Sequence, residues 1–206
     1  MSTSLHEIYN RFADTYESNR GAFDISSILR MFYDALGKNE GELLDLGCGA
    51  GEPVARYFIG KGWRVTGVDF SGRMLELAAK YAPEMNTTES DMREIRFAPN
   101  QFDAITATYS IFHIPVVDHF DLFRNIHRWL KPEGRVLFTY ATKEYTGSDR
   151  FSGYKRFIDT DLFYSHATPD ELFRDLEAIG FAIDSRDYHT IGGETFLWVT
   201  TKKLTD

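Results

Sequence analysis

Predicted strands and helices alternate from residue 42 to residue 141, and this order restricts the fold more than any other feature of the chain. Short apolar stretches bounded by turn residues predict strands, and apolar residues that recur every three or four positions predict helices. The expected strands are 41–47, 63–70, 85–91, 102–110 and 134–142, and the expected helices between them are 52–62, 71–82 and 116–130. This alternation predicts an α/β fold whose mostly parallel sheet is covered by helices on both faces.

The two ends of the chain extend this pattern. Amphipathic helices are expected over 5–17 and 23–37 before the first strand, and a helix over 168–180 begins with the capping-box sequence Thr-Pro-Asp-Glu. Two further strands, 181–189 and 195–203, flank a Gly-Gly turn, which predicts a hairpin and hence one antiparallel strand at the sheet edge. The 206 residues are expected to form a single domain, with residues 1–40 as an N-terminal helical cap.

Residues 142–167 interrupt the alternation. Aromatic residues are dense here, yet no helical or strand period holds, so we expect an irregular segment. The aromatic side chains either wall an apolar pocket over the site or cover the edge of the sheet.

Composition restricts the partners. The net charge of -8 argues against binding to nucleic acid or to an anionic membrane and favours a small-molecule substrate. The single cysteine, Cys48, excludes an internal disulfide, and no metal site is expected. No stretch has the length of a signal peptide core or a membrane span, so a cytoplasmic location is expected. The expected oligomeric state is a monomer or a homodimer.

Three glycines, Gly47, Gly49 and Gly51, follow the first strand in "LLDLGCGAGEP". A loop of this kind lets a ligand approach the backbone at the start of the next helix. A dinucleotide fingerprint needs a third glycine where this chain has Glu52, whose carboxylate would face a pyrophosphate. NAD, FAD and, without a GK[ST] sequence, nucleoside triphosphates therefore match poorly.

Asp69 ends the second strand, twenty residues after Gly49. A carboxylate at this position accepts hydrogen bonds from both ribose hydroxyls of an adenosine in the crevice. Together with the glycine loop, Asp69 predicts an adenosine ligand without a 2′-phosphate.

These residues resemble the motifs of the class I S-adenosylmethionine (SAM)-dependent methyltransferases. The acid and glycines of "LDLGCGAG", the ribose-binding acid of "VTGVDFS", the acid and apolar residue of "ESDMRE", and the turn "LKPEG" occur in the family's order. The leading "IYNRFADTYESNR" is similar to a helix that folds over SAM in such enzymes. The resemblance implies a Rossmann-like seven-stranded sheet in the order 3-2-1-4-5-7-6, with strand 7 antiparallel.

The resemblance also implies a set of residues that bind SAM and its product S-adenosylhomocysteine. They are Asp45, Gly47, Cys48, Gly49, Gly51, Asp69, Phe70, Ser71, Met74, Asp91, Met92, Thr108, Tyr109, Tyr16 and Arg20. The predicted substrate-binding residues are Tyr9, Ser110, Tyr154, Tyr164 and His166.

Methyl transfer from a sulfonium is an in-line displacement that mainly requires alignment of the nucleophile and the methyl group. A base is needed only for a nucleophile that arrives protonated, and His113, just past the fourth strand, is the candidate. A structural role for His113 in packing its loop is the alternative. The sequence "TYSI" replaces the [DNS]PP[YF] signature, which argues against methylation of nucleic-acid bases.

The favoured function is a SAM-dependent methyltransferase that transfers a methyl group to an O, N or S atom of a small molecule. One alternative is a non-catalytic SAM-binding regulatory protein. The other is a nucleotide-dependent oxidoreductase, against which the missing third glycine counts.

Overall fold

The computed structural model describes residues 24–157 and 160–205. The expected helix over 5–17 lies outside these residues, and so do Tyr9, Tyr16 and Arg20. The helices are α2 (Ser26–Leu36), α3 (Val54–Ile59), α4 (Gly72–Tyr81), α5 (His119–Trp129), α6 (Lys143–Thr146) and α7 (Pro169–Ile179), with short 3-10 turns η1 (Ile111–His113) and η2 (Val116–Asp118). The strands are β1 (Glu42–Leu46), β2 (Arg64–Asp69), β3 (Asn86–Glu89), β4 (Phe102–Ala107), β5 (Leu130–Tyr140), β6 (Phe151–Phe157), β7 (Thr160–His166), β8 (Phe181–Ile191) and β9 (Glu194–Lys203).

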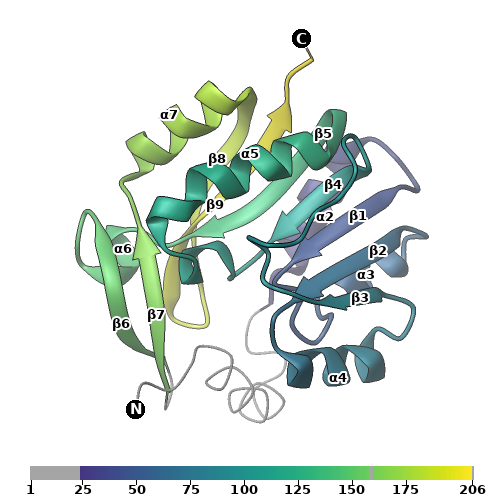
Figure 1. The fold of residues 1–206 in the computed structure, drawn as a ribbon, viewed down its shortest axis with the longest axis horizontal. Coiled ribbons are helices and arrows are strands. Elements are labelled where there is room, and N and C mark those ends of the chain that lie inside the picture. Colours follow the sequence, from purple (N-terminus) through teal and green to yellow (C-terminus); the bar gives the residue numbers. More distant parts are fainter. Residues whose placement is uncertain (1–23, 158–159, 206) are drawn as a thin grey trace.

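Seven strands form one twisted sheet in the order β3-β2-β1-β4-β5-β9-β8 (Figure 1). Strands β1 to β5 pair in parallel, whereas β9 is antiparallel to both β5 and β8. With the separate pair β6 and β7 set aside, this is the predicted order 3-2-1-4-5-7-6, so the expected fold class is confirmed. The hairpin predicted around the Gly-Gly turn is formed by β8 and β9.

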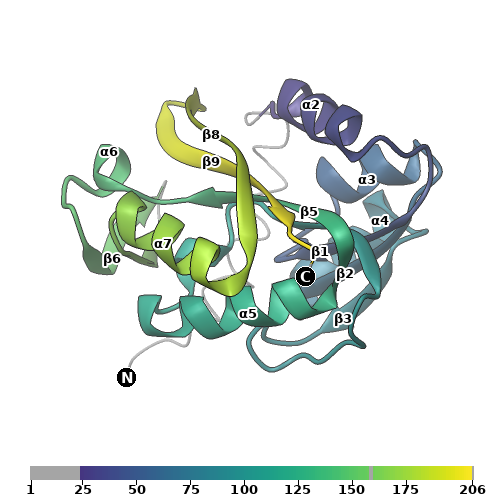
Figure 2. The same ribbon diagram turned by 90° about the horizontal axis from the view of Figure 1, so that it is seen from above.

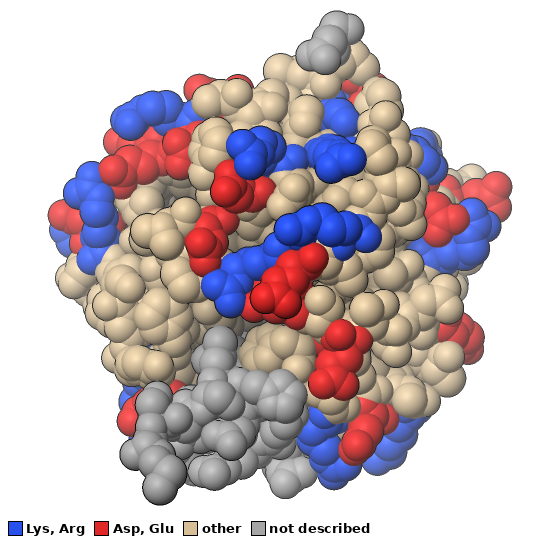
Figure 3. All heavy atoms as spheres, in the orientation of Figure 1, with Lys and Arg blue, Asp and Glu red and all other residues tan. Residues whose placement is uncertain are grey.

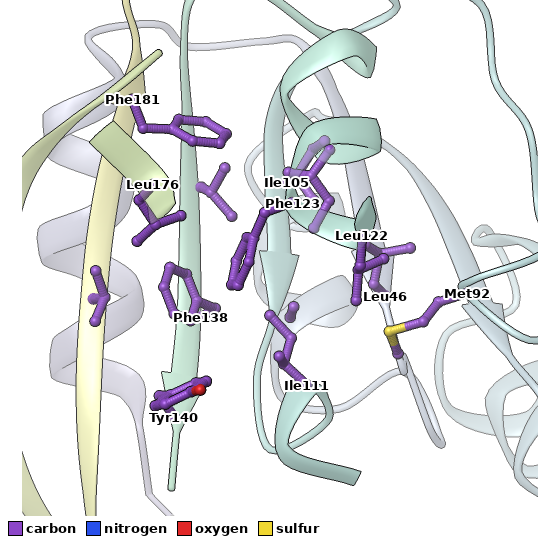
Figure 4. Packing of buried hydrophobic residues seen from close by; sticks show 14 of the residues in the cluster. Leu46, Met92, Ile105, Ile111, Leu122, Phe123, Phe138, Tyr140, Leu176 and Phe181 are labelled. Atoms are coloured by element: carbon purple, nitrogen blue, oxygen red, sulfur yellow. The ribbon is translucent and has the colours of Figure 1, made fainter. Parts of the chain in front are cut away.

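Helices cover both faces of the sheet (Figure 2). Helices α2, α3 and α4 lie over one face, and α5 and α7 lie over the other. Successive strand residues point to opposite faces, so Leu43 packs against α2 and α3 while its neighbour Leu44 belongs to the cluster with α5 and α7. Figure 4 shows the cluster on the α5 and α7 side of the sheet, in which Phe138 of β5 lies between Phe123 of α5 and Leu176 of α7.

The helix ends follow their local sequence. Ser71 caps α4 by accepting a hydrogen bond from the Met74 N–H at 3.3 Å. At the start of α7, the Thr168 hydroxyl accepts from the Glu171 N–H at 3.3 Å, and the Glu171 carboxylate accepts from the Thr168 N–H at 3.0 Å. This reciprocal pair is the capping box that the sequence predicts.

The segment 142–167 differs from the expectation of an irregular chain. It contains α6 and an antiparallel two-stranded sheet in which β6 and β7 pair from Phe151↔His166 to Phe157↔Thr160. Alternate residues of β6 are partly buried, but two of these positions are Gly153 and Lys155. Because these residues are not apolar, the period of two is hidden in the sequence.

Candidate functional site

A cavity of about 1080 Å³ lies at the carboxyl ends of β1, β2 and β4. Its wall continues through α2, η1, the β6–β7 hairpin and the first residues of β9. Pockets for small ligands usually measure ~300–1,000 Å³. The cavity therefore has room for a nucleoside-sized ligand and a second molecule beside it.

The three loop glycines have left-handed backbones but different surroundings. Their φ angles are +75° at Gly47, +50° at Gly49 and +76° at Gly51. A Cβ atom would lie 2.4 Å from the Ser110 Cβ at Gly47 and 2.8 Å from the Ala82 Cβ at Gly51, whereas at Gly49 it would meet no atom of the described residues within 4 Å beyond its chain neighbours. Gly47 and Gly51 thus permit close packing of the loop, and Gly49 keeps the cavity wall open.

Asp69 is fixed by backbone groups on both sides. Its two carboxylate oxygens accept hydrogen bonds from the N–H groups of Gly49 and Ser71, each at 2.9 Å. Burial raises the pKa of Asp69, and the backbone N–H groups of Ser71, Gly49 and Phe70 oppose this effect. The carboxylate is therefore held at the cavity wall in one orientation.

Asp45 is the next-to-last residue of β1, and its side chain is only 2% exposed. Its Oδ1 accepts a hydrogen bond from the Thr106 hydroxyl at 2.8 Å. Burial raises the pKa of Asp45 to about 7, the hydrogen bond from Thr106 opposes this shift, and the negative charge of Asp69 adds to it. Two neighbouring buried acids give this end of the cavity a preference for donors and positive charge.

Asp91 follows β3 and is bound by Arg93. The Arg93 guanidinium donates to Asp91 at 2.6 Å and to Asp118 at 2.8 Å, which links the loop after β3 to η2. Partial burial acts to raise the pKa of Asp91, but the hydrogen bonds from Arg93 outweigh it and the net shift is downward. Asp91 is thus an ionised acceptor in the wall, next to the buried Met92.

His113 lies in η1 with its imidazole against the hairpin. Its Nδ1 is 2.6 Å from the carbonyl oxygen of Phe163. Because a carbonyl only accepts, this contact assigns the proton to Nδ1 and leaves the lone pair on Nε2. Burial lowers the pKa of His113 to about 4, so the imidazole is neutral at pH 7.

Beside His113 the wall is aromatic, and we name Tyr109, Phe112, Tyr164 and Phe196 the aromatic chamber. The Phe112 ring stacks on Phe196 at a centroid distance of 4.9 Å and on Tyr164 at 5.4 Å. The Tyr164 hydroxyl accepts a hydrogen bond from the Tyr145 hydroxyl at 3.0 Å. These contacts join residues from η1, β7 and β9 into one rigid surface.

The structure places most of the predicted site residues around this cavity. Those that line it are Asp45, Gly47, Cys48, Gly49, Asp69, Phe70, Met74, Asp91, Met92, Thr108, Tyr109, Ser110, His113, Tyr154 and Tyr164. Gly51 and Ser71 lie behind the wall, where they pack the loop and cap α4.

His166 is the exception among the described residues. Its imidazole is 1% exposed and does not line the cavity, since Nε2 contacts the Thr146 hydroxyl at 2.7 Å and Nδ1 contacts the Ala167 carbonyl at 2.9 Å. The structure therefore does not bring His166 to the cavity with the other predicted residues, and its role in substrate binding stays a prediction.

Sequence reasoning did not single out Arg93 or Glu194, which also line the cavity. Arg93 is two residues beyond Asp91, within reach of its carboxylate. Glu194 directly follows the Gly-Gly turn, which fixes its position in the hairpin but gives no sign of a cavity.

Comparison with known proteins finds methyltransferases among the similar sequences and structures. Residues 43–134 match the sequence profile of a methyltransferase domain. The chain is 28% identical over 217 residues to phosphoethanolamine N-methyltransferase 1 of Triticum aestivum, which covers 98% of this chain and 39% of that protein. The chain spans only 39–64% of the length of the first curated relatives it matches.

Solved structures show the same fold. The 1,6-didemethyltoxoflavin-N1-methyltransferase of Burkholderia thailandensis, bound to 1,6-didemethyltoxoflavin and S-adenosylhomocysteine, has a TM-score of 0.68 at 20% identity and covers 100% of this chain and 92% of that one. The [4+2]-cyclase SpnF has a TM-score of 0.74 at 17% identity, with 98% and 96% covered. The resemblance to the class I SAM-dependent methyltransferases is confirmed by the domain match and the fold.

Proposed function

We propose that this chain is a SAM-dependent methyltransferase that transfers a methyl group to an O, N or S atom of a small molecule. The observation that carries the proposal is a single cavity in which the glycine loop and the acids of the family motifs adjoin an aromatic chamber containing a neutral histidine. The similarity to SpnF means that the fold alone does not define methyl transfer, so the site residues must support it.

The residues at the loop end fit S-adenosylmethionine. Asp69 presents a fixed carboxylate to a ribose, and Gly49 leaves the space that a nucleoside needs beside the backbone. Phe70 and Met92 supply apolar walls for an adenine, with Asp91 as an acceptor for its amino group. Asp45 faces the same space as an acceptor for the ammonium group of the amino-acid tail.

When bound, the sulfonium supplies an electrophilic methyl group and a neutral thioether leaving group. The chain itself orients the acceptor, excludes water and removes a proton where the nucleophile carries one. The aromatic chamber performs the first two tasks, because its stacked rings hold an apolar body against the loop. His113 removes the proton of the nucleophile through Nε2, while the Phe163 carbonyl accepts the hydrogen bond from Nδ1–H.

We also propose that the chain acts as a single domain, as a monomer or homodimer, in which the segment 142–167 forms the acceptor side of the site. Tyr154 and Tyr164 of this segment line the cavity. Nucleic acid is not a proposed partner: acidic and basic side chains are intermixed on the face shown in Figure 3, and the net charge is -8. No helix of residues 24–157 and 160–205 is long and apolar enough to cross a membrane.

Calorimetric titration with S-adenosylhomocysteine tests the cofactor. We expect binding by the wild type and a loss of at least about tenfold in Asp69→Asn, since a neutral amide is a weaker acceptor for the ribose hydroxyls (tenfold corresponds to ~1.4 kcal/mol). The exposed acid Glu133, which does not line the cavity, provides the matched control Glu133→Gln. Absence of binding in the wild type would refute the proposal.

Incubation with methyl-labelled S-adenosylmethionine and a metabolite extract tests catalysis. Transfer of the label to a compound identified by mass spectrometry is the expected result. Binding of the cofactor with no transfer to any compound would favour the non-catalytic alternative. For an acceptor that must lose a proton, His113→Gln should lower kcat and remove the acid limb of its pH profile while leaving the affinity for S-adenosylhomocysteine unchanged.

A further inference from the structure

Glu194 occupies a fixed position at the aromatic chamber. The turn residues Gly192 and Gly193 have φ angles of +62° and +84°, and they pair Ile191 with Glu194 across the β8–β9 hairpin. Alternate strand residues share a face, so Glu194 lies on the same side of β9 as Phe196 of the chamber. Both residues line the cavity.

Tyr145 and Lys155 are the groups that favour the charged form of Glu194. Lys155 donates a hydrogen bond to the Tyr145 carbonyl and lies 4.0 Å above the centre of the Tyr145 ring. Among the described residues, no ion pair within 4.0 Å includes Glu194. By contrast, the cavity-lining Arg56 and Arg93 pair with carboxylates at 3.6 Å and 2.6 Å.

Glu194 is partly buried among aromatic side chains. Burial raises the pKa of Glu194, while the Tyr145 hydroxyl and the charge of Lys155 act in the opposite direction. Burial and the negative charge of Glu194 both raise the pKa of Tyr109 and of Tyr145. The carboxylate thus lies in a half-buried part of the cavity that is lined by aromatic side chains.

We propose that Glu194 and the aromatic chamber bind a positively charged group of the methyl acceptor, which makes the acceptor an ammonium-bearing molecule with an apolar or aromatic body. Aromatic faces attract cations, and a carboxylate with little water around it binds an ammonium through a charge-assisted hydrogen bond. The ammonium anchors the molecule, and the methylated atom is placed toward His113. Because it concerns the acceptor, this inference rests on the proposed function.

Two probes of the same shape test the proposal. 2-Phenylethylamine carries a positive charge at pH 7, and 2-phenylethanol is its neutral counterpart. In titrations of the full chain with S-adenosylhomocysteine present, we expect the wild type to bind the amine about tenfold more tightly than the alcohol. Glu194→Gln keeps the size of the side chain and should abolish the preference, whereas Glu194→Asp keeps the charge and should retain part of it.

Glu177→Gln is the matched control, because Glu177 is exposed on α7 and does not line the cavity. It should bind both probes like the wild type. Equal affinities of the wild type for the two probes, no measurable binding of the amine, or an unchanged preference in Glu194→Gln would each overturn the inference. Repeating the titrations without S-adenosylhomocysteine separates the two proposals: a cation preference in a chain that does not bind this nucleoside would refute the proposed function and leave the anchor at Glu194 intact.

Discussion

Adding a methyl group to Gly49 should separate ligand binding from stability. The Gly49 backbone is left-handed, so Gly49→Ala should lower the free energy of unfolding by ~1 kcal/mol. The new Cβ meets no atom of the described residues within 4 Å beyond its chain neighbours, and Gly49 lines the cavity next to Asp69. It therefore occupies volume that the cofactor needs, and we expect the affinity for S-adenosylhomocysteine to fall by about tenfold or more, or at least ~1.4 kcal/mol.

Gly51→Ala is the matched comparison, because its backbone is left-handed as well. Here the Cβ would lie 2.8 Å from the Ala82 Cβ and 3.2 Å from the Met85 Cε, so overpacking adds ~1–3 kcal/mol to the backbone cost. Urea unfolding measures stability, and calorimetric titration at a temperature where both variants are folded measures affinity. The reasoning is refuted if Gly49→Ala binds S-adenosylhomocysteine like the wild type, or if it is destabilised as much as Gly51→Ala.

Three further predictions concern stability. Because burial raises the pKa of Asp45 to about 7 from an unfolded value of ~3.9, its contribution to the free energy of unfolding is present below pH ~4 and is lost as the pH rises to 7. Urea unfolding across this pH range should show that Asp45→Asn lacks this loss of stability. Burial acts to raise the pKa of Asp103, but hydrogen bonds from Lys131 and Lys38 lower it to about 2. Its contribution to the free energy of unfolding is therefore present above pH ~4 and lost as the pH falls to 2, and acid unfolding of Asp103→Asn should lack this pH dependence. Thr168→Ala removes the cap of α7 and should lower the free energy of unfolding by ~1 kcal/mol in urea, and an unchanged midpoint would contradict the capping argument.

The sequence predicts the sheet and the glycine loop well, because the residues that determine them are close together in the chain. The strand, the glycine loop and Asp69 are close together in the chain, and the spacing of the glycines limits which ligand fits beside them. Helix ends at Ser71 and Thr168 also depend on side chains within three residues of the cap.

Features that depend on distant pairing were predicted less well. The sequence places the end of a helix at Leu130 and a new strand from Gly134, but β5 already begins at Leu130, because this residue pairs with Phe102. His166 was also among the predicted substrate-binding residues. Strand β7 carries His166 past the cavity to Thr146, twenty residues away in the chain, and no local pattern reveals that contact.

The β6–β7 hairpin forms hydrogen-bonded strand pairs only within its own two-stranded sheet among the described residues, while its side chains reach the cavity. Its length and sequence can therefore change without altering the register of the seven-stranded sheet. On the proposed function, this arrangement makes the hairpin an exchangeable module. Grafting it from a relative should transfer acceptor preference in one step, and natural divergence can reach new acceptors through the same segment while the cofactor half stays unchanged.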